Sequence, residues 1–115
     1  MGGIHTVLTL LSAGDHVVCG ENVYGGTHRL MDKILTRLGL TFSFVDTRSA
    51  DTVSRAITPT TKMLFCETPT NPLMRLCDLA ALGDLARSHK LLFVVDNTFA
   101  TPVFQRPIEF GADIV

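Results

Sequence analysis

The sequence predicts an α/β fold: a mostly parallel sheet with helices on both of its faces. Short apolar runs alternate along the chain with longer segments whose apolar residues recur at helical spacing, which is typical of strands connected by helices. The run at 91–95 is apolar at all five positions, as expected for a strand buried on both faces. A chain of 115 residues can form at most one hydrophobic core, so we expect one domain.

The first half of the chain predicts two helix–strand units. The first unit is a helix over 3–12, ended by Gly14, and a strand over 17–19. In the second unit, a helix is followed by Gly39 and by a strand over 41–45. One face of that second helix is predicted to be apolar and buried; it consists of Leu30, Ile34, Leu35 and Leu38.

The second half repeats the alternation. It predicts a helix over 51–57, a strand over 63–66, a helix over 78–88 and a strand over 91–95. The segment 113–115 has the composition of the beginning of a further strand. Helices between successive strands imply parallel pairing.

Charge and hydropathy exclude several classes of partner. The net charge is −1, and the basic residues are scattered singly among acids, which argues against a nucleic-acid or anionic membrane surface. No apolar run approaches the roughly 18 residues of a membrane span, and the N-terminus lacks the basic and apolar regions of a secretory signal. We therefore expect a cytoplasmic protein.

The cysteines and histidines show no metal-ligand pattern. Cys19, Cys66 and Cys77 lack C-x-x-C spacing and lie in or beside apolar runs, which predicts buried, reduced thiols. The four histidines form no cluster with one another or with the cysteines. We expect no metal site.

Two polar loops follow predicted strands and are the candidate functional segments. They are Glu67-Thr-Pro-Thr-Asn-Pro72 and Asp96-Asn-Thr-Phe-Ala-Thr-Pro102. Open α/β sheets bind ligands at the carboxyl ends of their strands, so Asp96 is the first candidate for chemistry. The two prolines of the first loop would stiffen it and hold the side chain of Asn71. Turn formation in one loop and helix capping in the other remain open as structural alternatives.

Other known uses of an aspartate at a strand end match less well. A phosphatase of the Asp-x-Asp type needs a second acid where this chain has Thr98, and no dinucleotide or P-loop glycine pattern occurs. A receiver-like domain that binds phosphate at Asp96 needs an acidic pair after the first strand, where the chain offers only Glu21. The remaining functional interpretation is that the carboxylate of Asp96 pairs with a cationic heterocycle.

Five strings occur along the chain in a characteristic order: Val23-Tyr-Gly-Gly-Thr27, Glu67-Thr-Pro-Thr-Asn-Pro72, Val94-Val-Asp-Asn-Thr-Phe99, Gln105-Arg-Pro107 and Gly111-Ala-Asp113. In these strings and their order, the chain resembles over its whole length the pyridoxal phosphate enzymes of cysteine and methionine metabolism, the cystathionine γ-synthase and γ-lyase group. The resemblance implies the central part of the large domain of an aspartate aminotransferase-like fold, with pyridoxal phosphate as cofactor.

The same resemblance implies roles for individual residues. Asp96 would pair with the protonated pyridine nitrogen, and Tyr24 would stack on the ring and assist proton transfer. Asn71 would lie near the phenolic oxygen of the cofactor, and Thr98 beneath the ring.

Three further residues are assigned by position in the family. Met1 and Gly2 match the helix start whose backbone N–H groups hold the cofactor phosphate. Arg29 matches an arginine on the substrate side, where its cation could attract a carboxylate.

For the parent enzyme, the resemblance implies elimination or replacement at the β- or γ-carbon of a sulfur- or homoserine-derived amino acid. Cystathionine γ-lyase or γ-synthase activity is favoured; O-acetylhomoserine sulfhydrylase, cystathionine β-lyase and methionine γ-lyase are alternatives. A homotetramer built from dimers is implied.

The chain ends before the lysine that holds the cofactor as an aldimine in the family. We therefore expect residues 1–115 to be part of the large domain, truncated at both ends, without the C-terminal domain and inactive alone. A non-catalytic α/β remnant or binding module is the alternative of another class.

Overall fold

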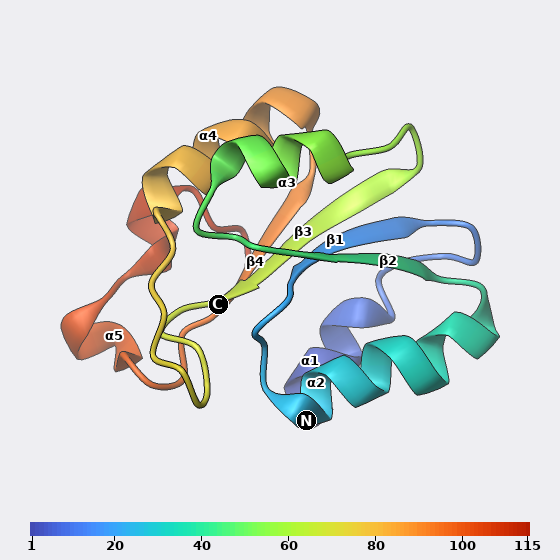
Figure 1. The fold of residues 1–115 in the computed structure, drawn as a ribbon, viewed down its shortest axis with the longest axis horizontal. Coiled ribbons are helices and arrows are strands. Elements are labelled where there is room, and N and C mark those ends of the chain that lie inside the picture. Colours follow the sequence, from blue (N-terminus) through green and yellow to red (C-terminus); the bar gives the residue numbers. More distant parts are fainter.

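All 115 residues are described by the computed structural model, whose centre is a four-stranded parallel sheet in the order β2-β1-β3-β4 (Figure 1). The strands are β1 (His16–Gly20), β2 (Thr41–Val45), β3 (Thr61–Glu67) and β4 (Leu92–Asp96). All three strand pairs are parallel. The predicted fold class is confirmed, and the prediction for β2 matches its bounds. Strand β1 is one residue longer at each end than predicted, and β3 is two residues longer at its start and one at its end. Strand β4 starts and ends one residue later than predicted.

Helices cover both faces of the sheet. Helices α1 (Gly2–Leu8) and α2 (Gly25–Arg29) lie on one face, whereas α3 (Ala50–Ala56) and α4 (Leu79–His89) lie on the other (Figure 1). Each face has a core cluster of 11 buried residues. Alternate side chains of β3 enter opposite clusters: Phe65 packs towards α1 and α2, and Leu64 towards α3 and α4.

The second predicted helix is not one regular α-helix. After α2, the chain continues through a π-helical turn, η1 (Leu30–Ile34), and a 3-10 turn, η2 (Leu35–Leu38). Leu30 and Leu35 are buried as predicted, but Ile34 and Leu38 are 51% and 64% exposed. The wider π turn changes the angle between successive residues, so a face read at α-helical spacing is wrong for these two positions. Gly39 ends the segment with a φ of 88°.

Helix α1 ends at Leu8, four residues before its predicted end. Beyond it, the N–H groups of Leu10 and Leu11 donate to carbonyls only three residues back. The hydroxyl of Thr9 donates to the Thr6 carbonyl at 2.6 Å, which competes with a regular helical turn. The helical spacing of apolar residues therefore extends beyond the helix itself, which is why the predicted end is too late.

Side-chain caps set the starts of α3 and α4. The Ser49 hydroxyl accepts from the N–H of Thr52 at 3.3 Å, and the Asp78 carboxylate accepts from the N–H of Ala81 at 3.0 Å. Both helices match their predictions to within one residue at each end.

Two short helices after β4 were not predicted, namely α5 (Thr101–Phe104) and the 3-10 helix η3 (Pro107–Phe110). The backbone of η3 packs directly on α4: a Cβ placed on Gly83 would lie 2.0 Å from the Phe110 carbonyl oxygen. Beyond η3, Ile114 forms an isolated parallel bridge with Val94, within the segment 113–115 where the beginning of a further strand was predicted.

A buried polar group closes the sheet at the amino ends of its strands. His16 is 5% exposed; its Nδ1 lies 2.7 Å from Thr61 Oγ1, and its Nε2 lies 2.9 Å from Ser43 Oγ. Burial lowers the pKa of His16, because the charged imidazolium is poorly solvated there. The ring is thus held neutral between three neighbouring strands.

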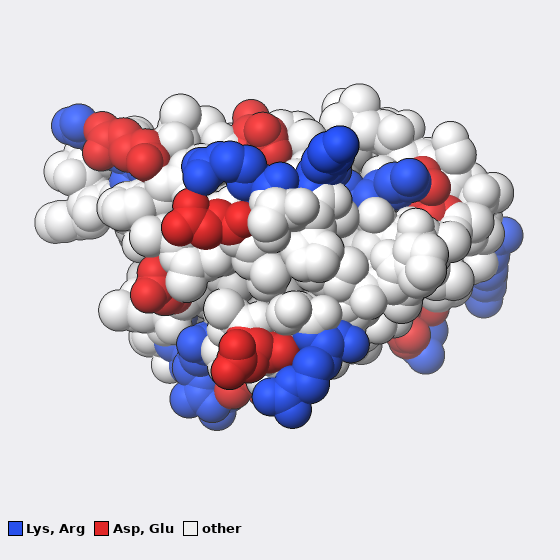
Figure 2. Space-filling model, turned by 90° about the horizontal axis from the view of Figure 1, so that it is seen from above, with Lys and Arg blue, Asp and Glu red and all other residues white.

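The surface carries both signs of charge. On the face in Figure 2, lysine and arginine lie next to aspartate and glutamate, with uncharged surface between them. Several of these groups pair locally, such as Arg87 with Asp84 at 2.8 Å. None of the helices is long and apolar enough to cross a membrane.

Candidate active site

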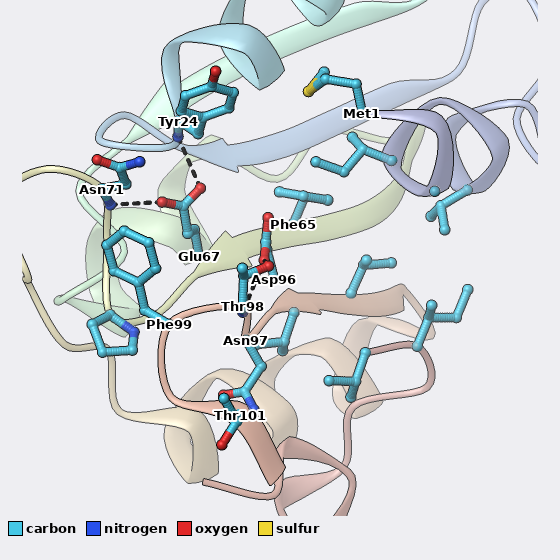
Figure 3. A pocket seen from close by; sticks show the side chains of 18 of the residues that line it. Met1, Tyr24, Phe65, Glu67, Asn71, Asp96, Asn97, Thr98, Phe99 and Thr101 are labelled. Carbon is cyan, nitrogen blue, oxygen red and sulfur yellow. Dashed lines mark hydrogen bonds between the residues drawn. The ribbon is translucent and has the colours of Figure 1, made fainter. Parts of the chain in front are cut away.

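The main cavity lies at the carboxyl ends of β1, β3 and β4. The chain leaves β1 over the face covered by α2 but leaves β3 over the face covered by α4, so the two connections diverge at this edge of the sheet. Such a switch point is where open α/β sheets bind ligands. The cavity here has a volume of about 820 Å³ (Figure 3).

Asp96 ends β4 and presents a carboxylate to this cavity. Its Oδ1 accepts hydrogen bonds from both the backbone N–H and the hydroxyl of Thr98, the former at 3.1 Å. Its Oδ2 makes no hydrogen bond with the rest of the chain. Apolar residues such as Phe65 and Val94 line the cavity beside it. The site therefore offers an oriented carboxylate oxygen beside an apolar wall.

Glu67 connects two of the loops around the cavity, and the sequence interpretation gave it no role. It is 5% exposed, and its two carboxylate oxygens accept from different backbones: the N–H of Tyr24 at 2.8 Å and the N–H of Asn71 at 2.7 Å (Figure 3). One side chain thus fixes the loops after β1 and β3 together. A signal was present in the sequence, since an acid at the end of a buried strand requires partners.

Burial raises the pKa of Glu67, and the carboxylate of Asp96 adds to this rise. The two residues are paired in register on neighbouring strands, so their charges oppose each other. The hydrogen bonds from the Tyr24 and Asn71 backbones act in the opposite direction and favour the ionised carboxylate. Two carboxyl groups therefore lie side by side at the carboxyl end of the sheet.

Tyr24 forms the opposite side of the cavity and immediately precedes α2. Its side chain is 48% exposed. A Cβ on Gly26 would lie 2.5 Å from Tyr24 Cε1 and 3.2 Å from Met1 Sδ. Position 26 must therefore be glycine for the phenol ring and the Met1 side chain to keep these positions.

Side-chain amides brace the loop after β4. Gln105 Nε2 donates to Asn97 Oδ1 at 2.8 Å and to the Thr68 carbonyl at 2.9 Å, while Asn97 Nδ2 donates to the Gln105 carbonyl at 2.9 Å. These bonds tie the loops after β3 and β4 to the end of α5. Asn97 and Gln105 thereby support the loops that carry Asn71 and Thr98.

Most of the predicted site residues share this cavity, and two do not. Its lining includes Met1, Tyr24, Asn71, Asp96 and Thr98. Gly2 and Arg29 instead line a neighbouring hollow of about 380 Å³, which also includes Met1. Arg29 is the last residue of α2 and is exposed.

The lining suits a flat, cationic heteroaromatic ring. One wall offers a carboxylate oxygen without a partner in the chain, the opposite side offers an exposed phenol ring, and the surface between is largely apolar. A protonated ring nitrogen complements the carboxylate, and an aromatic ring stacks favourably on tyrosine. The residues present therefore fit pyridoxal phosphate.

Comparison with protein families agrees with this geometry. The family described as Cys/Met metabolism PLP-dependent enzyme matches residues 1–115, the whole chain. The chain belongs to this family. Its cofactor is accordingly pyridoxal phosphate, as the residues of the cavity also indicate.

Individual members of this PLP-dependent family are identical to the chain at about half of its 115 positions. The chain is 51% identical over 115 residues to the cystathionine gamma-lyase of Bacillus subtilis (strain 168). It is 49% identical over 115 residues to a cystathionine beta-lyase of Lactococcus lactis subsp. cremoris (strain MG1363). In each case the match covers 100% of this chain and 30% of the relative.

A solved structure shows the same fold. The crystal structure of a cystathionine gamma-lyase from Lactobacillus plantarum, complexed with L-serine, matches with a TM-score of 0.96 and 52% sequence identity. The match covers 98% of this chain and 30% of that structure. The chain thus spans about a third of the length of the family members that it matches.

Proposed function

We propose that the protein is a PLP-dependent transsulfuration enzyme of the cystathionine γ-lyase or γ-synthase type. It would catalyse elimination or replacement at the β- or γ-carbon of a sulfur- or homoserine-derived amino acid. The observation that carries this proposal is the joint position of Asp96, Tyr24 and Asn71 around one cavity at the switch point of the sheet. O-acetylhomoserine sulfhydrylase, cystathionine β-lyase and methionine γ-lyase are alternatives within the family.

Asp96 is proposed to hold the proton of the cofactor's pyridine nitrogen. Thr98 fixes one carboxylate oxygen and leaves the other for this bond. When bound, pyridoxal phosphate supplies an electron sink for the substrate carbanion. In this arrangement, Asp96 keeps the ring cationic, and Thr98 orients the carboxylate from beneath the ring.

Tyr24 is proposed as the stacking residue and as a proton carrier. Its ring can cover one face of a flat cofactor, and its phenol can move a proton at the leaving group of the substrate. Asn71 would orient the phenolic oxygen of the cofactor and the substrate carboxylate with its side-chain amide. The Glu67 bonds to both backbones support these assignments, because they fix the two residues relative to each other.

Three assignments concern residues that line the neighbouring hollow. Met1 and Gly2 would hold the cofactor phosphate with the backbone N–H groups at the start of α1, which have no intrahelical partners. Arg29 would attract a substrate carboxylate; it lines the neighbouring hollow, which shares Met1 with the main cavity. We further propose that the whole enzyme is a cytoplasmic homotetramer built from dimers.

The proposal is tested with the full-length protein, translated from the complete reading frame that contains this chain. We expect a visible absorption band from bound pyridoxal phosphate that borohydride reduction fixes covalently. Turnover of cystathionine, O-succinylhomoserine and O-acetylhomoserine then identifies the reaction. A folded protein that binds the cofactor but turns over none of these substrates would contradict the transsulfuration assignment.

A chimera separates the residues of this chain from the rest of the protein. In it, residues 1–115 replace the matching 115 residues of the Bacillus subtilis enzyme, and the unmodified host serves as control. We expect the chimera to bind pyridoxal phosphate. If it folds and binds none, the site residues of this chain do not serve the cofactor, and a non-catalytic α/β module becomes the better interpretation.

A further inference from the structure

Asp113 binds the segment after η3 to β4 through both its backbone and its side chain. Its N–H donates to the Phe93 carbonyl at 2.8 Å, and its Oδ2 accepts from the Phe93 N–H, also at 2.8 Å. Both backbone polar groups of Phe93 are therefore bonded to one residue. The proposed function gives Asp113 no role.

The Asp113 carboxylate replaces a hydrogen bond of the strand ladder. Ile114 lies in parallel register with β4. Its N–H donates to the Phe93 carbonyl at 3.3 Å, and its carbonyl accepts from the Val95 N–H at 3.0 Å. In a parallel ladder that began earlier, the Phe93 N–H would donate to the carbonyl of Ala112. It donates instead to the side chain of Asp113.

The backbone before Asp113 is still in the turn that follows η3. This 3-10 helix ends at Gly111, whose φ is 93°, and the N–H of Ala112 donates back to the Pro107 carbonyl at 3.1 Å. Phe93 is fully buried, so a backbone N–H without a partner at this position would destabilise the fold. The carboxylate of Asp113 satisfies that N–H one residue before strand pairing begins.

The register of this segment decides which side chains face the main cavity. Phe65 and Ile114 lie on either side of Val94 in one row, and all three line the cavity. Asp96, two residues beyond Val94, faces the same side of β4, so this row is the part of the wall next to the carboxylate. A slip by one residue would turn Ile114 to the opposite face and remove it from the row.

We propose that Asp113 is a positioning residue of the cofactor cavity. It fixes the register of residues 113–115 on β4 and thereby holds Ile114 and Val115 in the cavity wall. Asp113 itself does not line the cavity, so it acts through these two residues. The inference rests on the proposed function, which assigns this cavity to pyridoxal phosphate.

The geometry predicts that the hydrogen-bond acceptor of Asp113 matters and its charge does not. Asp113→Asn keeps an oxygen at the same distance from the backbone, so it can still accept from the Phe93 N–H. Asp113→Glu keeps the charge, but its additional methylene moves the oxygens away from that position. Asp113→Ala has no acceptor and leaves the buried N–H unpaired.

The first measurement is amide hydrogen exchange at Phe93 in the full-length protein, purified with its cofactor. In Asp113→Ala, this amide should exchange at least about tenfold faster than in the unmodified protein, and Asp113→Asn should restore its protection. This readout does not depend on activity. If the unmodified protein bound no pyridoxal phosphate, the proposed function would fail, while exchange at Phe93 would still report the bond. Equal exchange in Asp113→Ala and the unmodified protein overturns the proposal.

Titration with pyridoxal phosphate then tests whether the bond positions the site. The dissociation constant should rise about tenfold in Asp113→Ala and Asp113→Glu and stay unchanged in Asp113→Asn. Glu109→Ala, which removes an exposed acid of η3, is the control and should bind the cofactor like the unmodified protein.

A purely structural role predicts a different result. It would lower the unfolding temperature of Asp113→Ala and leave its cofactor titration unchanged, which overturns the proposal. Tighter cofactor binding by Asp113→Glu than by Asp113→Asn also overturns it, because charge rather than geometry would then matter. If Asp113→Ala does not fold, the comparison of these two variants decides by itself.

Discussion

The two ends of the sheet treat buried polar groups differently. At the amino ends of the strands, the two ring nitrogens of His16 are each within hydrogen-bond distance of a hydroxyl on a neighbouring strand. At the carboxyl ends, Glu67 accepts from two loop backbones, and Asp96 keeps one oxygen without a partner in the chain. The second end opens into a cavity of about 820 Å³.

We expect this difference to separate polar groups that stabilise the fold from polar groups that bind a ligand. Side chains that satisfy each other contribute to folding and have no capacity left for a ligand. Side chains that are oriented by backbone or by a neighbouring residue retain acceptors that can face a cavity. Substitutions at the carboxyl ends of the strands should therefore change activity or cofactor binding, whereas substitutions at the amino ends should change mainly stability.

The largest effect is expected for Asp96→Asn in the full-length protein. The amide oxygen can still accept from Thr98, but the negative charge at the cavity is lost, so kcat/KM should fall about 100- to 1,000-fold with little change in thermal stability. Asp84→Asn, an exposed carboxylate on α4, is the matched control and should retain activity. Equal activity of both variants would refute the role of Asp96.

A smaller effect is expected for Glu67→Gln, which tests the contact between the loops. Glutamine has a single side-chain oxygen, so its NH₂ group must face the N–H of either Tyr24 or Asn71. We expect a loss of about 1–3 kcal/mol in the free energy of unfolding and about tenfold weaker cofactor binding. Glu109→Gln, an exposed substitution on η3, should change neither quantity. Unchanged cofactor titrations for Glu67→Gln would show that the bridge does not position the site.

The smallest effect on activity is expected at the closed end, for His16→Gln. The variant should keep kcat and KM but lose about 1–2 kcal/mol of stability at pH 8, because Thr61 and Ser43 lose a ring partner. If kcat changed while stability did not, the division between the two ends would be wrong.

His16 also predicts a dependence of stability on pH. Its pKa in the folded protein lies below the ordinary value of about 6.5, so the unfolded chain binds the proton more readily. Stability should therefore be fully present above about pH 6.5 and fall as the pH is lowered through the folded-state pKa. Thermal unfolding measured between pH 5 and about pH 8 should show that the stability of His16→Gln falls less steeply with decreasing pH than that of the unmodified protein.

The sequence was most informative where local pattern determines structure. The apolar runs located all four strands, and Ser49 and Asp78 cap helices close to where periodicity begins. It failed at Ile34 and Leu38, because a π turn within a helical segment has no signal in apolar spacing. The short helices after β4 were missed because four-residue elements have too few positions to show a period.

Part of the candidate site could be predicted, because the carboxyl ends of parallel strands lie at the same edge of the sheet. Asp96 and Asn71 each follow a recognisable strand, and both line the cavity. The position of Glu67 indicated that its carboxylate needs partners, but their identity could not be predicted, since they are backbone N–H groups, one of them 43 residues away.

The contact between Gly83 and η3 has a genetic consequence. Every amino acid other than glycine carries a Cβ, and at position 83 that atom would lie 2.0 Å from the carbonyl oxygen of Phe110. Any missense change in this codon would therefore displace η3, and with it Asp113, whose carboxylate accepts from the N–H of Phe93 at 2.8 Å. In a saturation library selected for function, codon 83 should retain only synonymous changes, although Gly83 does not line the candidate site.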